Sequence, residues 1–285
     1  MTTATAAPFR FFDAHVVRSA RLGPSMVRVT FGGAQLDQFA SGGRDQSFSL
    51  FLPHPGQSHP VVPTDAGTGW FARWRAMDPA ERGVMRSYTV REQRREQGEV
   101  DVEFALHGDL GPASRWAGRA RPGDRVKLLG PADPENKSVG FRPPEGTDWV
   151  LIAADETALP AVAGILDWLP AGTRARVWIE VPHAGDVRDL ATRADATVSW
   201  LVRESAPAPR CDLLLDAVRS AHLPSGAPYA WIAGESGAVR GVRRHLVGER
   251  GFHRRRVTFS GYWRRGATEE DLRAEALSGA ARDRA

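Results

Sequence analysis

The chain has 285 residues, a formal net charge of +4 and a single cysteine. Because domains usually contain about 100–200 residues, this length fits one large domain or two ordinary ones. Apolar residues at 42% and charged residues at 25% are typical of globular proteins and argue against wholesale disorder. No segment approaches the ~20 consecutive apolar residues of a transmembrane helix, and the N-terminal MTTATAAPFR lacks a signal-peptide core. We therefore expect a cytoplasmic protein with no membrane span.

The lone cysteine, Cys211, excludes internal disulfides, a four-thiolate iron–sulfur cluster and a zinc site built from cysteines. The small net charge does not favour a nucleic-acid partner, and we expect none. Lys127 and Lys137 are the only lysines, so almost every strong base is an arginine. We favour a GC-rich genome as the explanation of this bias. The alternative, that arginine forks bind phosphates or carboxylates, has to be argued at each site.

Short alternating segments separated by turn residues characterise the first half of the chain. They predict a strand region over 14–31, strands at 47–52, 85–90, 100–106 and 125–129, and a short helix at 70–76 within a long loop. Several short strands of this kind predict a small antiparallel barrel or sandwich.

The second half alternates apolar strands with segments of helical spacing. Strands are predicted at 148–154, 176–181, 196–202, 229–233 and 256–259, and helices at 158–169, 213–222 and 237–249. This alternation predicts a parallel sheet with crossover helices, followed by a short terminal helix after residue 266. The Pro- and Gly-rich segment 141–147 separates the halves. We therefore predict an α+β two-domain chain, with domains at 1–143 and 144–285.

The segment RSYTVR (86–91) is the first candidate site. A strand there puts Arg86, Tyr88 and Val90 on one face and Ser87, Thr89 and Arg91 on the other. An arginine and a flat ring on one edge could hold a diphosphate and a planar heterocycle. The alternative is an edge strand with two solvated arginines.

The segment HGDLGPASRWA (107–117) joins a strand end to a helix start. Free N–H groups in the first turn of a helix, together with the helix dipole, favour a bound anion. A phosphate site is therefore one interpretation. The alternative is a capped helix with Trp116 packed beneath it.

Three further segments follow predicted strands: DETALP (155–160), AGESG (233–237) and GYWRRG (261–266). The carboxyl ends of parallel strands are where α/β domains bind ligands. Asp155 or Thr157 could instead cap a helix. The glycine fingerprint G-x-G-x-x-G is missing after the first strand of this half, so an ordinary dinucleotide motif is excluded.

Together, RSYTVR, HGDLGPASRWA, DETALPA, AGESGAVRGVRRHL and GYWRRG closely resemble the siderophore-interacting protein family of flavin-dependent ferric-siderophore reductases. The resemblance extends from about Phe11 to Gly266. It implies the ferredoxin-reductase-like fold: an FAD-binding antiparallel β-barrel followed by an α/β domain of the NAD(P)H-binding type. Relatives commonly have Asp-x-His-Val-Lys-Leu where this chain has Asp45–Leu50, so Ser47 and Ser49 replace two basic residues. Ala154 stands where relatives usually have glycine.

The resemblance also implies which residues bind the cofactor FAD. These are Arg86, Ser87, Tyr88, Thr89, Val90, Arg91, His107, Asp109, Gly111, Ala113, Ser114, Asp155, Thr157 and Ala158. We expect no catalytic side chain, because electron transfer to iron needs no general acid or base, and we expect no metal site. Arg264, Arg265 and Arg243 are candidates for attracting an anionic substrate, with Arg240 and Arg244 as alternatives.

The implied activity is reduction of a ferric siderophore, which releases Fe(II) because hard oxygen ligands hold it far more weakly than Fe(III). NAD(P)H or a ferredoxin is the expected electron donor. We favour NADPH, because an arginine such as Arg243 can accommodate a 2′-phosphate. Two alternatives stay open: an NAD(P)H:flavin oxidoreductase with another acceptor, and a flavin-bearing protein that only binds siderophores.

Overall fold

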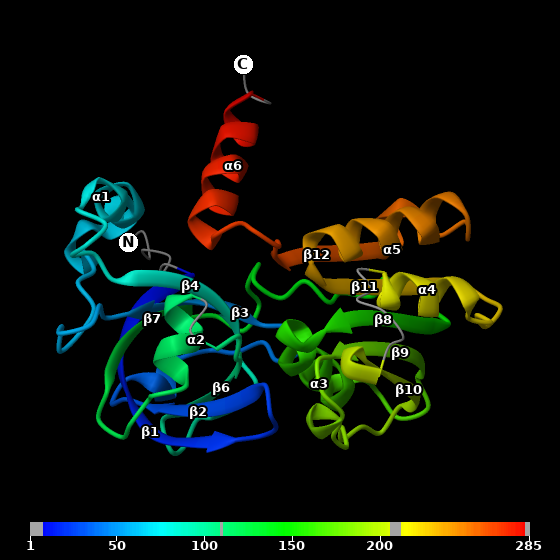
Figure 1. The fold of residues 1–285 in the computed structure, drawn as a ribbon, viewed down its shortest axis with the longest axis horizontal. Coiled ribbons are helices and arrows are strands. Elements are labelled where there is room, and N and C mark those ends of the chain that lie inside the picture. The colour runs from blue at the N-terminus through cyan, green and yellow to red at the C-terminus, as the bar shows by residue number, and fades with distance from the viewer. Residues whose placement is uncertain (1–7, 109–110, 206–211, 283–285) are drawn as a thin grey trace, which may run out of the picture. The chain divides into compact units, whose positions relative to one another are not determined.

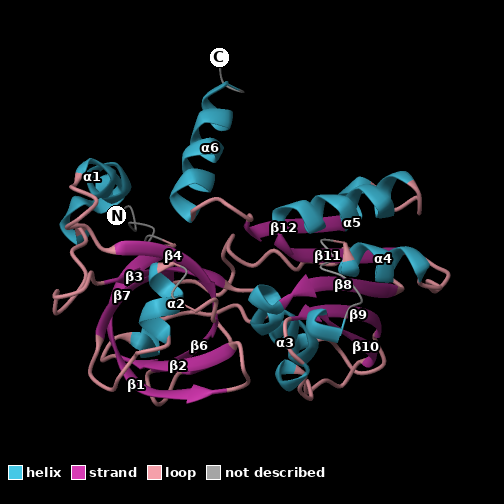
Figure 2. Cartoon of the chain, in the orientation of Figure 1, coloured by secondary structure: helices cyan, strands magenta, loops and turns pink. Residues whose placement is uncertain are grey.

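The computed structural model describes residues 8–108, 111–205 and 212–282, and the chain divides into two compact units. The first unit extends to Gly140 and also includes Ala163–Trp168, whereas the second comprises Phe141–Val162 and the chain from Leu169 onward. The first contains a curled antiparallel sheet and the second a parallel sheet flanked by helices (Figures 1 and 2). None of the helices in the described residues is long and apolar enough to cross a membrane.

The sheet of the first unit is antiparallel throughout, with the strand order β4-β3-β7-β1-β2-β6-β5. Its strands are β1 (Phe9–Arg21), β2 (Met26–Gly32), β3 (Ser47–Leu52), β4 (Val84–Thr89), β5 (Glu92–Arg94), β6 (Glu99–Ala105) and β7 (Arg125–Pro131). The ring centroids of Tyr88 on β4 and Phe104 on β6 lie 4.4 Å apart, so edge strand β4 returns over β6. The sheet is therefore a partly open barrel, as predicted.

Alternation along β2 and β6 separates a core face from a polar face. Val29, Phe31 and Phe104 are fully buried in the core, where each such side chain contributes roughly 1.5–3 kcal/mol of hydrophobic stabilisation. On the other face the register pairs Arg28 with Glu103, and their side chains form an ion pair at 2.6 Å. Charged residues thus line the outside of these strands while apolar residues fill the barrel.

Two short helices accompany this sheet: α1 (Trp70–Ala76) and α2 (Pro112–Ala117). Helix α1 has the bounds expected from the sequence, and its buried Trp74 donates its indole N–H to the carbonyl of Gly83. Helix α2 packs through Trp116, whose ring centroid lies 6.0 Å from that of Phe31 and 6.1 Å from that of Phe104. Trp116 therefore fastens α2 to the core face of the sheet.

The second unit has a five-stranded parallel sheet of order β10-β9-β8-β11-β12, which confirms the predicted alternation. The strands are β8 (Trp149–Asp155), β9 (Arg174–Val181), β10 (Asp195–Val202), β11 (Pro228–Glu235) and β12 (Val257–Trp263). The helices are α3 (Leu159–Trp168), α4 (Leu213–Ser220), α5 (Ser236–Gly248) and α6 (Glu269–Arg282). Central strand β8 is buried along its whole length, as a strand covered on both faces requires.

The strand order places a topological switch point between β8 and β11. The chain leaves β8 through α3 toward β9, whereas it leaves β11 through α5 toward β12, in the opposite direction. Ligands of open α/β sheets bind outside the carboxyl ends of the strands at such a point. In this chain those ends carry Asp155 and Glu235.

Candidate functional site

Strand β4 presents Arg86 and Tyr88 half-buried, while Ser87 between them is exposed. Thr89, predicted on the same face as Ser87, is buried, so exposure does not separate the two predicted faces along the whole strand. One Nη of Arg86 donates to the carbonyl of Met85 at 2.8 Å. Thr89 is buried and pairs with Ser47 in the sheet register. Arg86 and Tyr88 are thus the residues of β4 that combine a cation, a flat ring and partial exposure.

Arg91, just beyond β4, lies among carboxylates. Its Nη1 is 2.9 Å from Asp167, and its Nε is 4.0 Å from the buried Glu103. Val90, before it, belongs to the hydrophobic core. Arg91 and Val90, both predicted to bind FAD, therefore contact other residues of the chain: Arg91 forms ion pairs and Val90 packs in the core.

The start of α2 depends on Gly111, whose φ of +88° and ψ of 145° suit glycine alone. Buried Ser114 uses its hydroxyl locally: it accepts from the N–H of His107 at 2.9 Å and donates to the carbonyl of Gly108 at 3.0 Å. Main-chain N–H groups of the first turn, those of Ala113 and Ser114, are what α2 can offer an anion. Asp109 lies outside the described residues.

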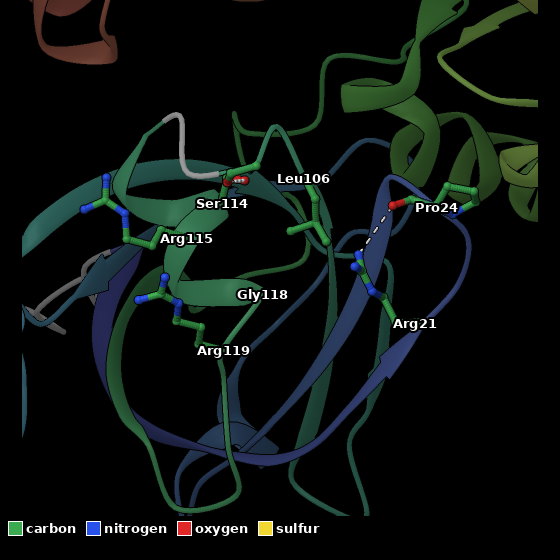
Figure 3. Close-up of a pocket in the computed structure, with 8 residues that line it drawn as sticks. Arg21, Pro24, Leu106, Ser114, Arg115, Gly118 and Arg119 are labelled. Atoms are coloured by element: carbon green, nitrogen blue, oxygen red, sulfur yellow. Dashed lines mark hydrogen bonds between the residues drawn. The ribbon is translucent and has the colours of Figure 1, made fainter. Parts of the chain in front are cut away.

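A cavity of about 300 Å³ opens beside α2, between its flank and the β1–β2 turn (Figure 3). Arg115 in α2, Arg119 just after it and Arg21 at the end of β1 are among its lining residues, and the Arg21 guanidinium is turned toward the carbonyl of Pro24 (Figure 3). Leu106 supplies apolar lining, and the eight lining residues include three arginines and no acid. This volume lies at the lower end of the usual range for ligand pockets. The donor set suits an anionic ligand.

No motif in the sequence points to this cavity. Arg115 falls inside a predicted segment, yet Arg21 lies far away along the chain, at the end of β1, where the sequence has no motif of its own. Only the pairing of β1, β2 and β6 brings the two together.

At the carboxyl edge of the parallel sheet, the carboxyl group of Asp155 is buried and receives four hydrogen bonds. Thr157 donates through its N–H at 2.9 Å and through its hydroxyl at 2.5 Å. The N–H of Glu235 donates at 2.7 Å, and the indole Nε1 of Trp263 at 2.8 Å. Burial, together with the charge of Glu156, raises the pKa of Asp155 to about 6. Asp155 also caps the turn that follows β8, which confirms the capping prediction.

The other predicted residues of this loop lie close by: Thr157 is half-buried and Ala158 is fully buried. Glu156, between them and Asp155, points its buried carboxylate at Arg203, with distances of 2.6 and 2.9 Å. Arg203 also pairs with Glu180 at 2.9 Å. This cluster was missed from the sequence, because its members come from three separate strand ends.

The basic residues predicted to attract substrate are spread over the second unit. Arg264 forms a two-pronged ion pair with Glu275 of α6, with both distances 2.7 Å, and Arg265 is exposed. The Arg243 guanidinium lies 4.5 Å from the ring centroid of Phe259, and its Nε is buried with no partner in the described residues. Arg240 and Arg244 are both exposed on α5, as the helical spacing predicted.

Comparison with known proteins identifies the family. Residues 147–266 match the family described as siderophore-interacting protein, and residues 15–135 match the siderophore-interacting FAD-binding domain. The structure is similar to that of the siderophore-interacting protein SipS from Aeromonas hydrophila, with a TM-score of 0.77 and 31% identity over 96% of this chain and 100% of the other. The chain belongs to the siderophore-interacting protein family.

Two curated relatives carry activity names. The ferric vibriobactin reductase ViuB of Vibrio cholerae is 29% identical over 91% of this chain and 91% of its own. The NADPH-dependent ferric-chelate reductase of Escherichia coli is 29% identical over 89% and 93%. The ferredoxin reductase of carbazole 1,9a-dioxygenase shares the fold, with a TM-score of 0.62 at 16% identity over 91% of this chain and 71% of that chain. The ferredoxin-reductase-like fold expected from the sequence is therefore confirmed.

Proposed function

We propose that this protein is an FAD-dependent oxidoreductase that reduces ferric siderophores with electrons from NADPH and releases Fe(II). The observation that carries the proposal is membership of the siderophore-interacting family over both units, including its FAD-binding domain. The names of the Vibrio cholerae and Escherichia coli relatives, a ferric vibriobactin reductase and an NADPH-dependent ferric-chelate reductase, support the substrate class and the donor.

The residues of the first unit fit FAD. Its diphosphate needs cations and N–H donors, and Arg86, the first turn of α2 and the arginines of the cavity beside α2 supply both. Tyr88 offers a flat ring for a planar heterocycle, and its partner Phe104 holds that ring in place. We therefore assign the flavin to the β4 side and the adenosine phosphate end to the cavity of Arg21, Arg115 and Arg119.

Bound FAD supplies the redox chemistry, since it can take two electrons as a hydride and pass them on one at a time. The chain binds and orients the flavin, and its second unit presents the carboxyl edge of the parallel sheet to the donor nucleotide. Arg265 is the candidate of the GYWRRG segment for steering an anionic ferric complex, because its side chain is exposed whereas Arg264 is half-buried.

The decisive experiment follows the oxidised-flavin absorbance band under anaerobic conditions. Purified protein should be yellow, release FAD on denaturation, and bleach when NADPH is added. A ferric siderophore should then restore the band while a ferrous chelator traps Fe(II). The gallium(III) complex of the same siderophore is the control, because it has the same charge but accepts no electron.

Each alternative predicts a different outcome. A protein that binds siderophores without catalysis would leave the reduced flavin unchanged with both complexes. A general flavin oxidoreductase would be reoxidised by simple quinones much faster than by any ferric siderophore. A colourless protein that binds no added FAD would overturn the proposal altogether.

A further inference from the structure

Trp263 is held in place at the carboxyl end of β12 by three separate restraints. A bulge inserts one extra residue into β12, so that Trp263 rather than Tyr262 pairs with Glu235 of β11. The carbonyl of Trp263 accepts the hydroxyl of Ser236 at 2.9 Å. Its indole Nε1 donates to Asp155 at 2.8 Å. Bulges re-aim side chains next to functional sites, and the two hydrogen bonds fix the ring once it is re-aimed.

The carboxylate that holds this indole joins the ends of three neighbouring strands. Asp155 terminates β8, accepts from the N–H of Glu235 at the end of β11, and accepts from Trp263 at the end of β12. Gly234 makes this approach possible: a Cβ there would lie 2.5 Å from the Asp155 carboxyl carbon. The backbone is therefore shaped around the carboxylate.

Asp155 itself is poorly suited to touch a ligand. Its side chain is buried, and four donors from three residues already occupy its oxygens. Trp263 differs, because it is only partly buried and its N–H is engaged by Asp155. The faces of the indole, rather than its N–H, are then what Trp263 can offer at an edge where α/β sheets bind nucleotides.

We propose that Asp155 is a positioning residue that holds the indole of Trp263 as a wall of the donor-nucleotide site. The inference deepens the proposed function and rests on it, since it takes NADPH as the donor. The two neighbouring carboxylates make other contacts. Glu156 pairs with Arg203, and Glu235 caps α5 by accepting from the N–H groups of Gly237 and Ala238.

The contact is tested first by the indole N–H resonances in a ¹H–¹⁵N spectrum of the purified, FAD-loaded protein. Trp263→Phe identifies one resonance among those of the nine tryptophans. Asp155→Ala should shift that resonance strongly. Asp155→Asn should largely preserve it, because the amide oxygen can still accept from the indole. Asp148→Ala is the matched control, since Asp148 accepts an N–H of Ala227 just before the opposite end of β8.

The role is tested by the dissociation constant of NADP⁺, measured by calorimetry on the same proteins. Loss of one aromatic packing contact is worth about 0.5–1.5 kcal/mol, so Asp155→Ala and Trp263→Phe should each weaken binding by about 2- to 10-fold. The double variant should be no weaker than the weaker single variant, because both changes remove one contact. Asp155→Asn and the control Trp200→Phe, on the opposite edge strand β10, should stay near wild type.

The proposal is overturned if the Trp263 indole resonance does not shift in Asp155→Ala. It is also overturned if the NADP⁺ affinity is unchanged in both single variants. Thermal unfolding checks that each variant folds; if Asp155→Ala does not, an unchanged NADP⁺ affinity in Trp263→Phe still overturns the proposal. A wild type that binds no NADP⁺ also overturns it. That result would leave flavin-dependent iron reduction intact if reduced ferredoxin could still bleach the flavin.

Discussion

Ionisation of Asp155 opposes folding, because burial raises its pKa from the ordinary value of 3.8 to about 6, and the charge of Glu156 adds to the effect. The four hydrogen bonds act in the other direction without cancelling it. Between these two pKa values the folded protein binds more protons than the unfolded chain. The contribution of Asp155 to the free energy of unfolding is therefore highest below pH 4. It falls as the pH rises toward 6.

The first prediction concerns this pH dependence. Asp155→Asn removes the titration, so the variant should gain stability relative to wild type as pH rises from about 4 to about 7, by up to about 3 kcal/mol. Urea unfolding of both proteins across this pH range measures the difference. A difference that stays constant with pH would contradict the assignment.

A second prediction compares two arginines that differ in their surroundings. Arg86 is half-buried on β4 beside Tyr88, whereas Arg244 is exposed on α5. If Arg86 contacts the FAD diphosphate, Arg86→Ala loses a charge-assisted bond worth about 1.5–3 kcal/mol, or roughly 10- to 100-fold in FAD affinity. Arg244→Ala should retain FAD fully. Equal FAD retention after gel filtration would count against the proposed diphosphate position.

At the scale of the element, the start of α2 determines both the conformation of the preceding turn and the position of the arginines that line the cavity. Gly111 starts the helix at a positive φ, Pro112 follows at its first position, and Ser114 fastens the preceding turn through its hydroxyl. The same helix carries Arg115 and Arg119 on the side that lines the cavity. Placement of the arginines thus depends on the geometry of the helix start.

We expect Gly111→Ala to destabilise the protein although the site has room for a methyl group. No atom lies within 4 Å of the position of the added Cβ, so the cost comes from the backbone alone. An alanine at this φ costs about 1–3 kcal/mol. Chemical unfolding measures it, with Gly118→Ala as the control, because Gly118 has an ordinary φ of −65°. Equal stability of the two variants would refute the argument.

The cavity beside α2 leads to a prediction about cofactor choice. Arg119→Glu reverses a charge that we assign to the adenosine phosphate end of FAD. Binding of FAD should weaken about 10-fold or more, because a charge-assisted contact becomes a repulsion. Riboflavin, which has no phosphate, should bind the variant and wild type alike in fluorescence titrations. Similar losses for both ligands would place this cavity outside the FAD site.

At the scale of the whole molecule, the two units offer different binding features. The antiparallel unit has a buried apolar core and a charged outer face, and it matches the FAD-binding domain. The parallel unit supplies a sheet edge with a topological switch point, where strand ends from three segments converge. Net charge is only +4, so any steering of an anionic substrate has to come from local arginines.

Salt dependence tests that steering. Raising ionic strength from about 0.01 M to about 0.15 M shortens the Debye length from about 30 Å to about 8 Å. The second-order rate of flavin reoxidation should therefore fall for an anionic ferric complex and stay nearly constant for a neutral one. Stopped-flow absorbance measures both rates. Equal slopes for the two complexes would show that long-range attraction contributes nothing.

Sequence alone was sufficient for most elements and for the fold class. The predicted helix at 70–76 and the strand at 47–52 match α1 and β3 residue for residue, because hydrophobic periodicity and flanking Pro or Gly are local signals. It missed β5, whose three residues Glu92–Arg94 are all polar and form a strand only by pairing with β6. It also ended the last strand at 259, since the exposed residues Ser260 and Gly261 break the alternation.

Tertiary structure decided which side chains meet. Asp155 and Trp263 are 108 positions apart, and only the strand order and the bulge in β12 bring the indole to the carboxylate. Arg91 and Asp167 are 76 positions apart, and they also meet only in the tertiary structure, where Arg91 donates to the Asp167 carboxylate. Local sequence encodes the period and the ends of an element through its own neighbours. Contacts between distant residues depend on strand pairing and register, which involve the whole chain.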